Sequence, residues 1–232
     1  MEIEDRFVEL GGLRFHYREA GDPDAHPVVL LHGLGPGCDD WDEVAIALAD
    51  RHRTLAFELR GCHGSARAEE YSFELMRDDV RAFADELGLE RYSLAGHSMG
   101  GTVAILLAEA LAEASPDRLD HLVLEDTPPP VGGGPPVPAG DPPPDLPFDL
   151  EMARAIIRQV NEPDPAWWER LGDITAPTLF LAGGPDSHVP QDLIADAAAR
   201  IPGCELVTLG GGHQVHRERR DPFVAAVRSF LG

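Results

Sequence analysis

Residues 94–101 read LAGHSMGG, and this stretch decides the fold. The apolar run at 92–95 predicts a short buried strand, and the apolar and small residues at 99–114 predict a helix. Ser98 stands between them, with one glycine two positions before it and another two positions after it. A strand that turns directly into a helix brings backbone against backbone, and glycine leaves room for that approach. The stretch therefore predicts a tight strand–turn–helix with the Ser98 hydroxyl exposed at its tip.

Short apolar runs alternate with helical patterns along the rest of the chain. FVELGGLRFHYR at 7–18 reads as a hairpin around two glycines. Further strands are expected at 27–31, 54–57, 92–95, 122–125, 178–182 and 205–209, and helices at 39–49, 71–87, 99–114, 191–200 and 222–231. We expect one α/β domain over residues 1–232, with a mostly parallel central sheet, an N-terminal β-hairpin and helices on both faces. Ligands of such sheets bind beyond the carboxyl ends of the strands.

One segment breaks this alternation. Residues 127–147 read TPPPVGGGPPVPAGDPPPDLP, and so much proline and glycine excludes a helix or a central strand. A short amphipathic pattern beginning at Phe148 and the pair Trp167-Trp168 follow. Because the sheet pattern then resumes, we expect a short proline-rich lid inserted at about residues 127–171, before the last two strands. A disordered loop is the alternative.

Composition excludes several function classes. The net charge is −22, and all 19 basic residues are arginine. An acidic surface repels nucleic acid and anionic membranes, so we expect neither as a partner and a small-molecule substrate instead. The absence of lysine excludes Schiff-base chemistry. The chain has no run of 18 apolar residues, no signal-peptide pattern at its start and three widely spaced cysteines, so a cytoplasmic location is expected.

Several motifs occur in a meaningful order. GHSMG matches G-x-S-x-G between a predicted strand and a predicted helix, the setting that a nucleophile elbow requires. LLHGLG at 30–35 precedes it, and APTLFLAGGPDSHVP at 176–190 and LGGGHQVHRERRDPFVAAVRSFL at 209–231 follow it. Together these motifs resemble the α/β-hydrolase fold superfamily in its lid-bearing, single-domain form, and the resemblance covers nearly the whole chain.

The resemblance implies a role for each motif. Ser98 would be the nucleophile, His213 its general base and Asp186 the acid that orients the histidine. The backbone N–H groups of Leu34 and Met99 would form the oxyanion hole, in which one donor is typically worth about 2.7–4 kcal/mol of barrier. The plain alternative for the serine is a glycine-rich turn without catalysis.

Two aspartates are candidates for the acid. Asp186 lies after the strand at 178–182, in the family's G-x-x-D-x-x-V-P spacing, and is preferred for that reason. Asp126 lies after the strand at 122–125, where some relatives carry the acid. Either aspartate can instead be an ordinary turn former.

The other histidines need separate interpretations. His216 is the rival base, three residues after His213. His97 is expected to pack inward, and His32 to brace the oxyanion loop. A metal site would use four residues: His213, His216, Asp186 and His188. Their spacing fits no standard zinc signature and leaves the serine unexplained, so we expect no metal and no cofactor.

One stretch departs from the family pattern. Residues 58–66 read ELRGCHGSA, whereas the family tends to show D-x-R-G-x-G-x-S at this place. Glu58 replaces the aspartate, and one extra residue is present. The pocket wall at Cys62 and His63 is therefore expected to be unusual, with loop packing as the plain alternative.

The expected activity follows from these residues. We expect a serine hydrolase that cleaves a small or medium, mainly apolar ester or related acyl compound through an acyl-enzyme. Four aromatic residues are expected to line the substrate pocket: Trp41, Phe148, Trp167 and Trp168. A carbon–carbon bond hydrolase or perhydrolase-like enzyme on the same triad is one alternative. A catalytically slow ligand-binding protein of the same fold is another.

Overall fold

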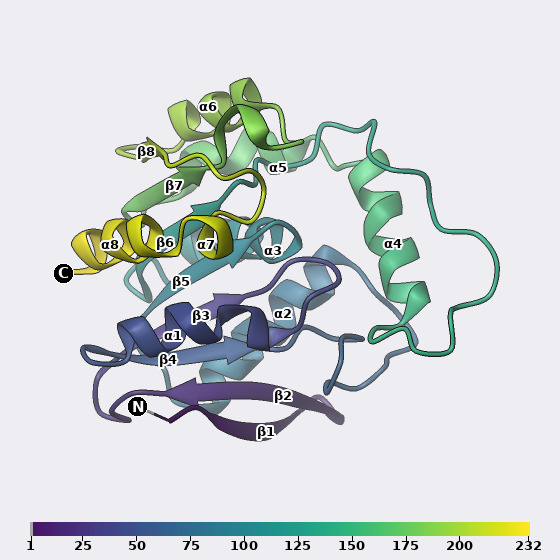
Figure 1. The fold of residues 1–232 in the computed structure, drawn as a ribbon, viewed down its shortest axis with the longest axis horizontal. Coiled ribbons are helices and arrows are strands. Elements are labelled where there is room, and N and C mark those ends of the chain that lie inside the picture. The colour runs from purple at the N-terminus through teal and green to yellow at the C-terminus, as the bar shows by residue number, and fades with distance from the viewer. Residues whose placement is uncertain (1) are drawn as a thin grey trace.

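A computed structural model describes residues 2–232, over which eight strands form one sheet in the order β1-β2-β4-β3-β5-β6-β7-β8 (Figure 1). The strands are β1 (Glu4–Leu10), β2 (Leu13–Ala20), β3 (His26–Leu31), β4 (His52–Phe57), β5 (Tyr92–His97), β6 (Leu119–Glu125), β7 (Thr178–Ala182) and β8 (Glu205–Thr208). β2 pairs antiparallel with β1 and with β4, and the other neighbours are parallel. The predicted mostly parallel sheet with an N-terminal hairpin is confirmed.

Helices cover both faces of this sheet (Figure 1). The α-helices are α1 (Asp42–Leu48), α2 (Phe73–Glu86), α3 (Met99–Ala114), α4 (Leu150–Asn161), α5 (Ala166–Glu169), α6 (Gln191–Arg200), α7 (Val215–Glu218) and α8 (Arg220–Leu231). Three 3-10 turns are η1 (Cys38–Trp41), η2 (Arg170–Asp173) and η3 (Gly184–Asp186). The expected helix at 39–49 is thus η1 followed by α1, and α7 is too short for periodicity to predict. In the part of the chain described, no helix is long and apolar enough to cross a membrane.

The strands divide their side chains between two hydrophobic cores. In β3, Val29 and Leu31 join the core under α2, α3 and α6, whereas Val28 and Leu30 join the core under α1 and α8. Successive strand residues point to opposite faces, so a strand with helices on both sides must be apolar throughout. Each fully buried side chain of this size stabilises the fold by about 1.5–3 kcal/mol. This requirement explains the continuous apolar runs in the sequence.

The proline-rich segment lies between β6 and β7, before the last two strands. Residues 128–149 contain no helix or strand, and α4 follows them. Met152 and Ile156 of α4 join the core under α2 and α3. Polar side chains hold the proline segment at several carbonyl groups: Arg154 Nε donates to Pro138 (2.9 Å), and Trp168 Nε1 donates to Pro130 (3.1 Å). The insertion is therefore anchored to the body of the protein on its helical side.

Candidate active site

Ser98 lies on the tight turn that the glycine spacing predicts. Its backbone has φ 54° and ψ −118°, a conformation that non-glycine residues rarely adopt. A Cβ on Gly96 would lie 2.4 Å from the Gly100 carbonyl oxygen, and one on Gly100 would lie 2.4 Å from the Leu31 carbonyl oxygen. No side chain fits at either place. The two glycines therefore permit β5, β3 and α3 to meet at Ser98.

His213 bridges Ser98 and Asp126. Its Nε2 lies 2.9 Å from Ser98 Oγ, and its Nδ1 lies 2.9 Å from Asp126 Oδ2. The histidine follows β8 on a loop with three glycines, all at positive φ, which carries the ring back over the strand ends. An ionised Asp126 accepts the Nδ1 hydrogen, so Nε2 presents its lone pair to the serine hydroxyl. The side chain of His213 is 21% exposed, whereas that of Asp126 is fully buried.

Asp126 is held as a carboxylate by several donors. Its Oδ1 accepts from the Gly183 backbone N–H (2.8 Å) and from Gln191 Nε2 (3.2 Å), and its Oδ2 accepts from Ser187 Oγ as well as from His213. Burial alone raises a carboxyl pKa, but these hydrogen bonds outweigh it and lower the pKa of Asp126 below its ordinary value. Asp126 is therefore charged at neutral pH.

The expected choice of acid is corrected by this geometry. Asp186 ends η3 with an exposed side chain, which makes no hydrogen bond within residues 2–232. The Asp186 backbone lies beside the histidine loop, since a Cβ on Gly212 would lie 3.3 Å from the Asp186 carbonyl oxygen, but the Asp186 residue is exposed and its carboxylate does not meet His213. The tip of β6 reaches the histidine. The loop after β7 instead supplies Gly183 and Ser187 as partners of Asp126.

The expected oxyanion donors lie beside the serine. A Cβ on Gly33 would lie 3.3 Å from Ser98 Cβ, so the loop that carries Leu34 adjoins Ser98. The Leu34 N–H donates to no group within the described residues 2–232. Met99 begins α3, where helix N–H groups lack intrahelical acceptors. His32 braces this loop, because its Nδ1 donates to the Gly33 carbonyl (2.7 Å) and its Nε2 accepts from the Leu59 N–H (3.2 Å).

His97 packs inward, as expected. It is buried, and burial lowers its pKa to about 4, so the ring is neutral. Its Nε2 donates to the His213 backbone carbonyl at 2.8 Å. The residue before the nucleophile thus fixes the backbone of the histidine loop.

His216, the rival base, contacts other partners than Ser98. Its Nδ1 lies 2.8 Å from Glu125, and its Nε2 lies 3.3 Å from Asp40. Burial lowers a histidine pKa, but the charge and hydrogen bonds of these two carboxylates outweigh it and raise the pKa of His216 to about 9. His216 is a buried cation and not a free base.

The prediction of pocket residues is wrong for two of the four. Trp41 is 1% exposed and stacks on His216 with ring centroids 4.6 Å apart, in the core under α1 and α8. Trp167 is 2% exposed and packs edge-on against Phe73 in the other core. Tryptophans are large apolar side chains, and here burial in a core outweighs a place in the pocket. Phe148 and Trp168 are half-buried and remain predicted pocket residues.

The alternative metal-ligand set is not assembled. His213 and His216 turn to different carboxylates, and Asp186 contacts neither. Over residues 2–232, two other groups bring three ligand atoms together: His16 with Cys38 and Glu58, and His97 with Glu125 and His216. Ser187 and Gln191, which donate hydrogen bonds to Asp126, were not predicted from the sequence. Their only signal was their position after the strand at 178–182.

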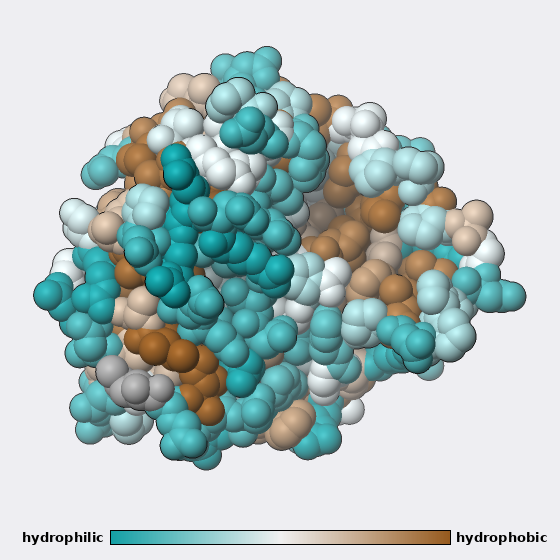
Figure 2. Space-filling model, viewed as in Figure 1, coloured by the Kyte–Doolittle hydropathy of each residue, from teal (hydrophilic) through white to brown (hydrophobic). Residues whose placement is uncertain are grey.

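A hollow opens beside this site. Figure 2 shows it with largely hydrophobic walls, between α4 and the rest of the molecule. The parallel strands end on the side that faces α4 (Figure 1). A substrate in this hollow would therefore reach the strand ends where Ser98 lies.

Comparisons with known proteins agree with this architecture. Residues 26–155 match the family model described as the alpha/beta hydrolase fold. The chain is 28% identical to 2-hydroxy-6-oxononadienedioate/2-hydroxy-6-oxononatrienedioate hydrolase 2 of Pseudomonas putida, covering 94% of this chain and 92% of that protein. It is 27% identical to the esterase YbfF of Escherichia coli, covering 88% and 92%.

A solved structure gives the same result. The crystal structure of a hydrolase from Pseudomonas aeruginosa superposes with a TM-score of 0.83 and 25% identity, covering 99% of this chain and 98% of that one. The family match spans more than half of the chain. The chain belongs to the α/β-hydrolase fold family.

Proposed function

We propose that this protein is a serine hydrolase whose catalytic triad is Ser98, His213 and Asp126. The observation that carries the proposal is the position of the His213 ring, 2.9 Å from the serine hydroxyl on one side and 2.9 Å from the buried carboxylate on the other. A serine hydroxyl is a weak nucleophile until an adjacent base takes its proton. This arrangement supplies the base, and Asp126 holds that base in the required tautomer.

The mechanism uses these groups in order. Ser98 Oγ attacks the substrate carbonyl carbon while His213 Nε2 takes the hydroxyl proton. The negative oxygen of the tetrahedral intermediate accepts hydrogen bonds from the N–H groups of Met99 and Leu34. The protonated His213 then gives its proton to the leaving group, and an acyl-enzyme forms. Water, activated by the same histidine, releases the acid product.

The substrate class that we propose is an uncharged, mainly apolar ester of small or medium size. The hydrophobic walls of the hollow beside α4 support it (Figure 2). The similarity to the E. coli esterase supports the bond type. Phe148 and Trp168, both half-buried and within the insertion, are the proposed aromatic contacts for the acyl chain.

A carbon–carbon bond hydrolase is the second candidate. It rests on the 28% identity to the P. putida hydrolase, which extends over nearly the full length of both chains. The same triad can serve either reaction, since both reactions require a carbonyl carbon beside the bond that is cleaved.

Two measurements test the proposal. A fluorophosphonate probe should label the purified protein at Ser98, because only an activated serine reacts. Hydrolysis of p-nitrophenyl esters of increasing acyl length, beside a 2-hydroxy-6-oxo-dienoate, then separates the two candidates by kcat/KM. Absence of both labelling and turnover in a folded sample would favour a ligand-binding protein of this fold.

We also propose that residues 127–171 act as a lid. The proline-rich stretch is mostly exposed, whereas α4 is anchored in the core. Limited proteolysis should cut within residues 128–147 before it cuts the core, and a long apolar product analogue should slow that cut. Equal resistance of this segment and the core in the free protein would argue for a fixed structural element.

A further inference from the structure

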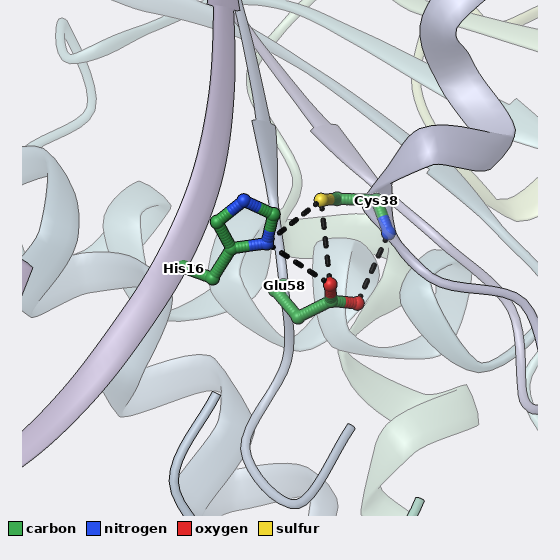
Figure 3. A group of neighbouring side chains, drawn as sticks. All are labelled: His16, Cys38 and Glu58. Atoms are coloured by element: carbon green, nitrogen blue, oxygen red, sulfur yellow. Dashed lines mark hydrogen bonds and ion pairs between the residues drawn. The ribbon is translucent and has the colours of Figure 1, made fainter. Parts of the chain in front are cut away.

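Three potential metal ligands outside the proposed triad converge at one point, where Glu58 Oε1 also lies 3.2 Å from His32 Nε2. His16 comes from β2, Cys38 begins η1 and Glu58 follows β4 directly. Figure 3 shows His16 Nδ1, Cys38 Sγ and Glu58 Oε2 directed toward one another. The atoms are 3.5 Å (Nδ1 to Sγ), 3.3 Å (Nδ1 to Oε2) and 3.4 Å (Sγ to Oε2) apart.

These separations match the edges of a tetrahedral zinc site. With Zn–N and Zn–O bonds of about 2.0–2.1 Å and a Zn–S bond of about 2.3 Å, tetrahedral geometry separates the ligand atoms by about 3.3–3.6 Å. An ion can therefore be placed without moving any of the three side chains far.

Two arrangements satisfy the three contacts: a bound metal ion, or a second proton on His16. His16 Nε2 lies 2.8 Å from Asp5 Oδ1, so a neutral His16 carries its proton there and presents an unprotonated Nδ1 to the cluster. The Cys38 thiol hydrogen is then the only proton available for three close contacts. A metal ion would satisfy all three lone pairs at once. A doubly protonated His16 is the metal-free alternative, and the experiment below separates the two.

The surroundings of the cluster are those of a metal site. A carboxylate on the far nitrogen of a ligating histidine fixes the ring and raises its basicity, and Asp5 has this position. The second oxygen of Glu58 accepts from the Cys38 backbone N–H at 3.0 Å, which orients the carboxylate. Glu58 and Cys38 are almost fully buried, and the side chain of His16 is 14% exposed.

An access route and a fourth coordination position are also present. The three side chains line a surface cavity of about 250 Å³, together with Asp5, Arg18 and His63. The cavity is large enough for water, which completes the coordination of zinc sites with three protein ligands. Asp5 and Asp39 add negative charge at the rim, which attracts a cation.

We propose that His16 Nδ1, Cys38 Sγ and Glu58 Oε2 bind one Zn²⁺ ion, with the fourth position open to the cavity. Cys38 binds as the thiolate, and its proton passes to solvent, so each ion bound releases one proton. The site joins β2, η1 and the end of β4, and η1 directly follows the loop that carries Leu34. This proposal revises the expectation of a metal-free protein and is independent of the hydrolase activity.

The test uses the whole chain after removal of metals with a chelator. Titration with Co²⁺ should produce a near-ultraviolet thiolate-to-cobalt charge-transfer band that saturates at one ion per chain, and Zn²⁺ should abolish it by displacement. Calorimetric titration with Zn²⁺ in buffers of different ionisation heat should show release of one proton. Weak binding of ions to surface carboxylates produces neither signal.

Variants place the ion at this cluster. Cys38→Ser should abolish the charge-transfer band, and His16→Ala should weaken Zn²⁺ binding at least 100-fold. Asp5→Asn changes an exposed residue that orients His16 and should weaken binding about 10–100-fold. Cys204→Ser is the matched control at a half-exposed thiol and should bind like the parent. If Cys38→Ser fails to fold, His16→Ala and Asp5→Asn decide the question.

The opposite results overturn the proposal. A folded parent protein without the charge-transfer band shows that the cluster is only a hydrogen-bonded network. Parent-like binding by His16→Ala, or loss of the band in Cys204→Ser, shows that the ion binds elsewhere.

Discussion

Two adjacent carboxylates at the end of β6 each hold a histidine from the segment that follows β8, and the two pairs behave differently. Asp126 pairs with His213 and Glu125 pairs with His216. The first histidine is partly exposed and reaches Ser98 with its free nitrogen. The second is 1% exposed at its side chain and lies between Glu125 and Asp40, against Trp41. A carboxylate–histidine pair thus occurs twice, once beside Ser98 and once in the core.

The difference lies in what occupies the second ring nitrogen. In His213 the second nitrogen faces a hydroxyl, so the ring can take up and return a proton. In His216 it faces another carboxylate, so the ring stays charged and links η1, β6 and α7. We infer that the Asp126 pair serves activity and the Glu125 pair serves stability. The following predictions test that division, beginning with the largest effect.

Removal of the Ser98 hydroxyl should abolish the contribution of the Asp126–His213 pair to catalysis. Ser98→Ala should lower kcat on an activated ester roughly 10⁴–10⁶-fold, because His213 then has no nucleophile to activate. Steady-state kinetics and circular dichroism on the same sample check both activity and folding. Retained activity in the purified variant would remove Ser98 from the proposed triad.

The next largest effect on kcat distinguishes the two candidate acids. Asp126→Asn should lower kcat about 10⁴-fold, because an amide donor favours the wrong tautomer of His213. Asp186→Asn is the matched control, and it should stay within about twofold of the parent because its side chain is exposed and surface changes alter free energies by about 0.5 kcal/mol. Kinetic losses in the reverse order would show that the observed pairing is not the functional one.

Breaking the buried pair should affect stability instead. Glu125→Gln should lower the free energy of unfolding by about 3–5 kcal/mol, because the buried positive charge of His216 then loses one of its two carboxylate partners. Urea denaturation measures this loss, and the exposed Glu113→Gln should cost about 0.5 kcal/mol or less. The kcat of a folded Glu125→Gln sample should fall less than about tenfold, because no reacting atom is touched. A loss of kcat as large as that of Asp126→Asn would end the division of roles.

The smallest predicted effect is a pH dependence of that stability. The pKa of His216 is raised to about 9 in the folded state, against about 6.5 in an unfolded chain. A raised pKa contributes stability that is complete below pH of about 6.5 and is lost as the pH rises to about 9. The charged groups that face the ring are Glu125 on β6 and Asp40 on η1. Asp40 is also paired with Arg217 on α7, and His97 on β5 is neutral.

The measurement is the difference in unfolding free energy between the parent and His216→Gln. This difference should be largest at about pH 6 and should shrink through pH 9, because the variant has no group there to titrate. A difference that is constant over this range would mean that His216 is not charged in the folded protein.

Much of the fold was predictable from local patterns. The continuous apolar runs predicted parallel strands covered on both faces, and Val28–Leu31 shows why, since alternate residues belong to opposite cores. The glycines around Ser98 predicted the tight turn for a steric reason that the backbone distances bear out. Sequence order and motif resemblance also placed Ser98 and His213 in one site.

The acid and the pocket were beyond such reasoning. Asp126 and Asp186 both follow strands and both lie beside the histidine loop, and only the tertiary structure shows that the Asp126 carboxylate meets His213 while Asp186 is exposed. Trp41 and Trp167 are large aromatic residues of the kind that line pockets, but their burial depends on which helices cover them.

Local steric and hydrophobic requirements act between neighbours in the chain, so the sequence alone was enough for the strands, the helices and the nucleophile turn. Contacts between residues far apart in the chain depend on the arrangement of the whole sheet. The tertiary structure therefore decided which carboxylate holds His213, that His216 is a buried cation, and that His16, Cys38 and Glu58 meet at one point.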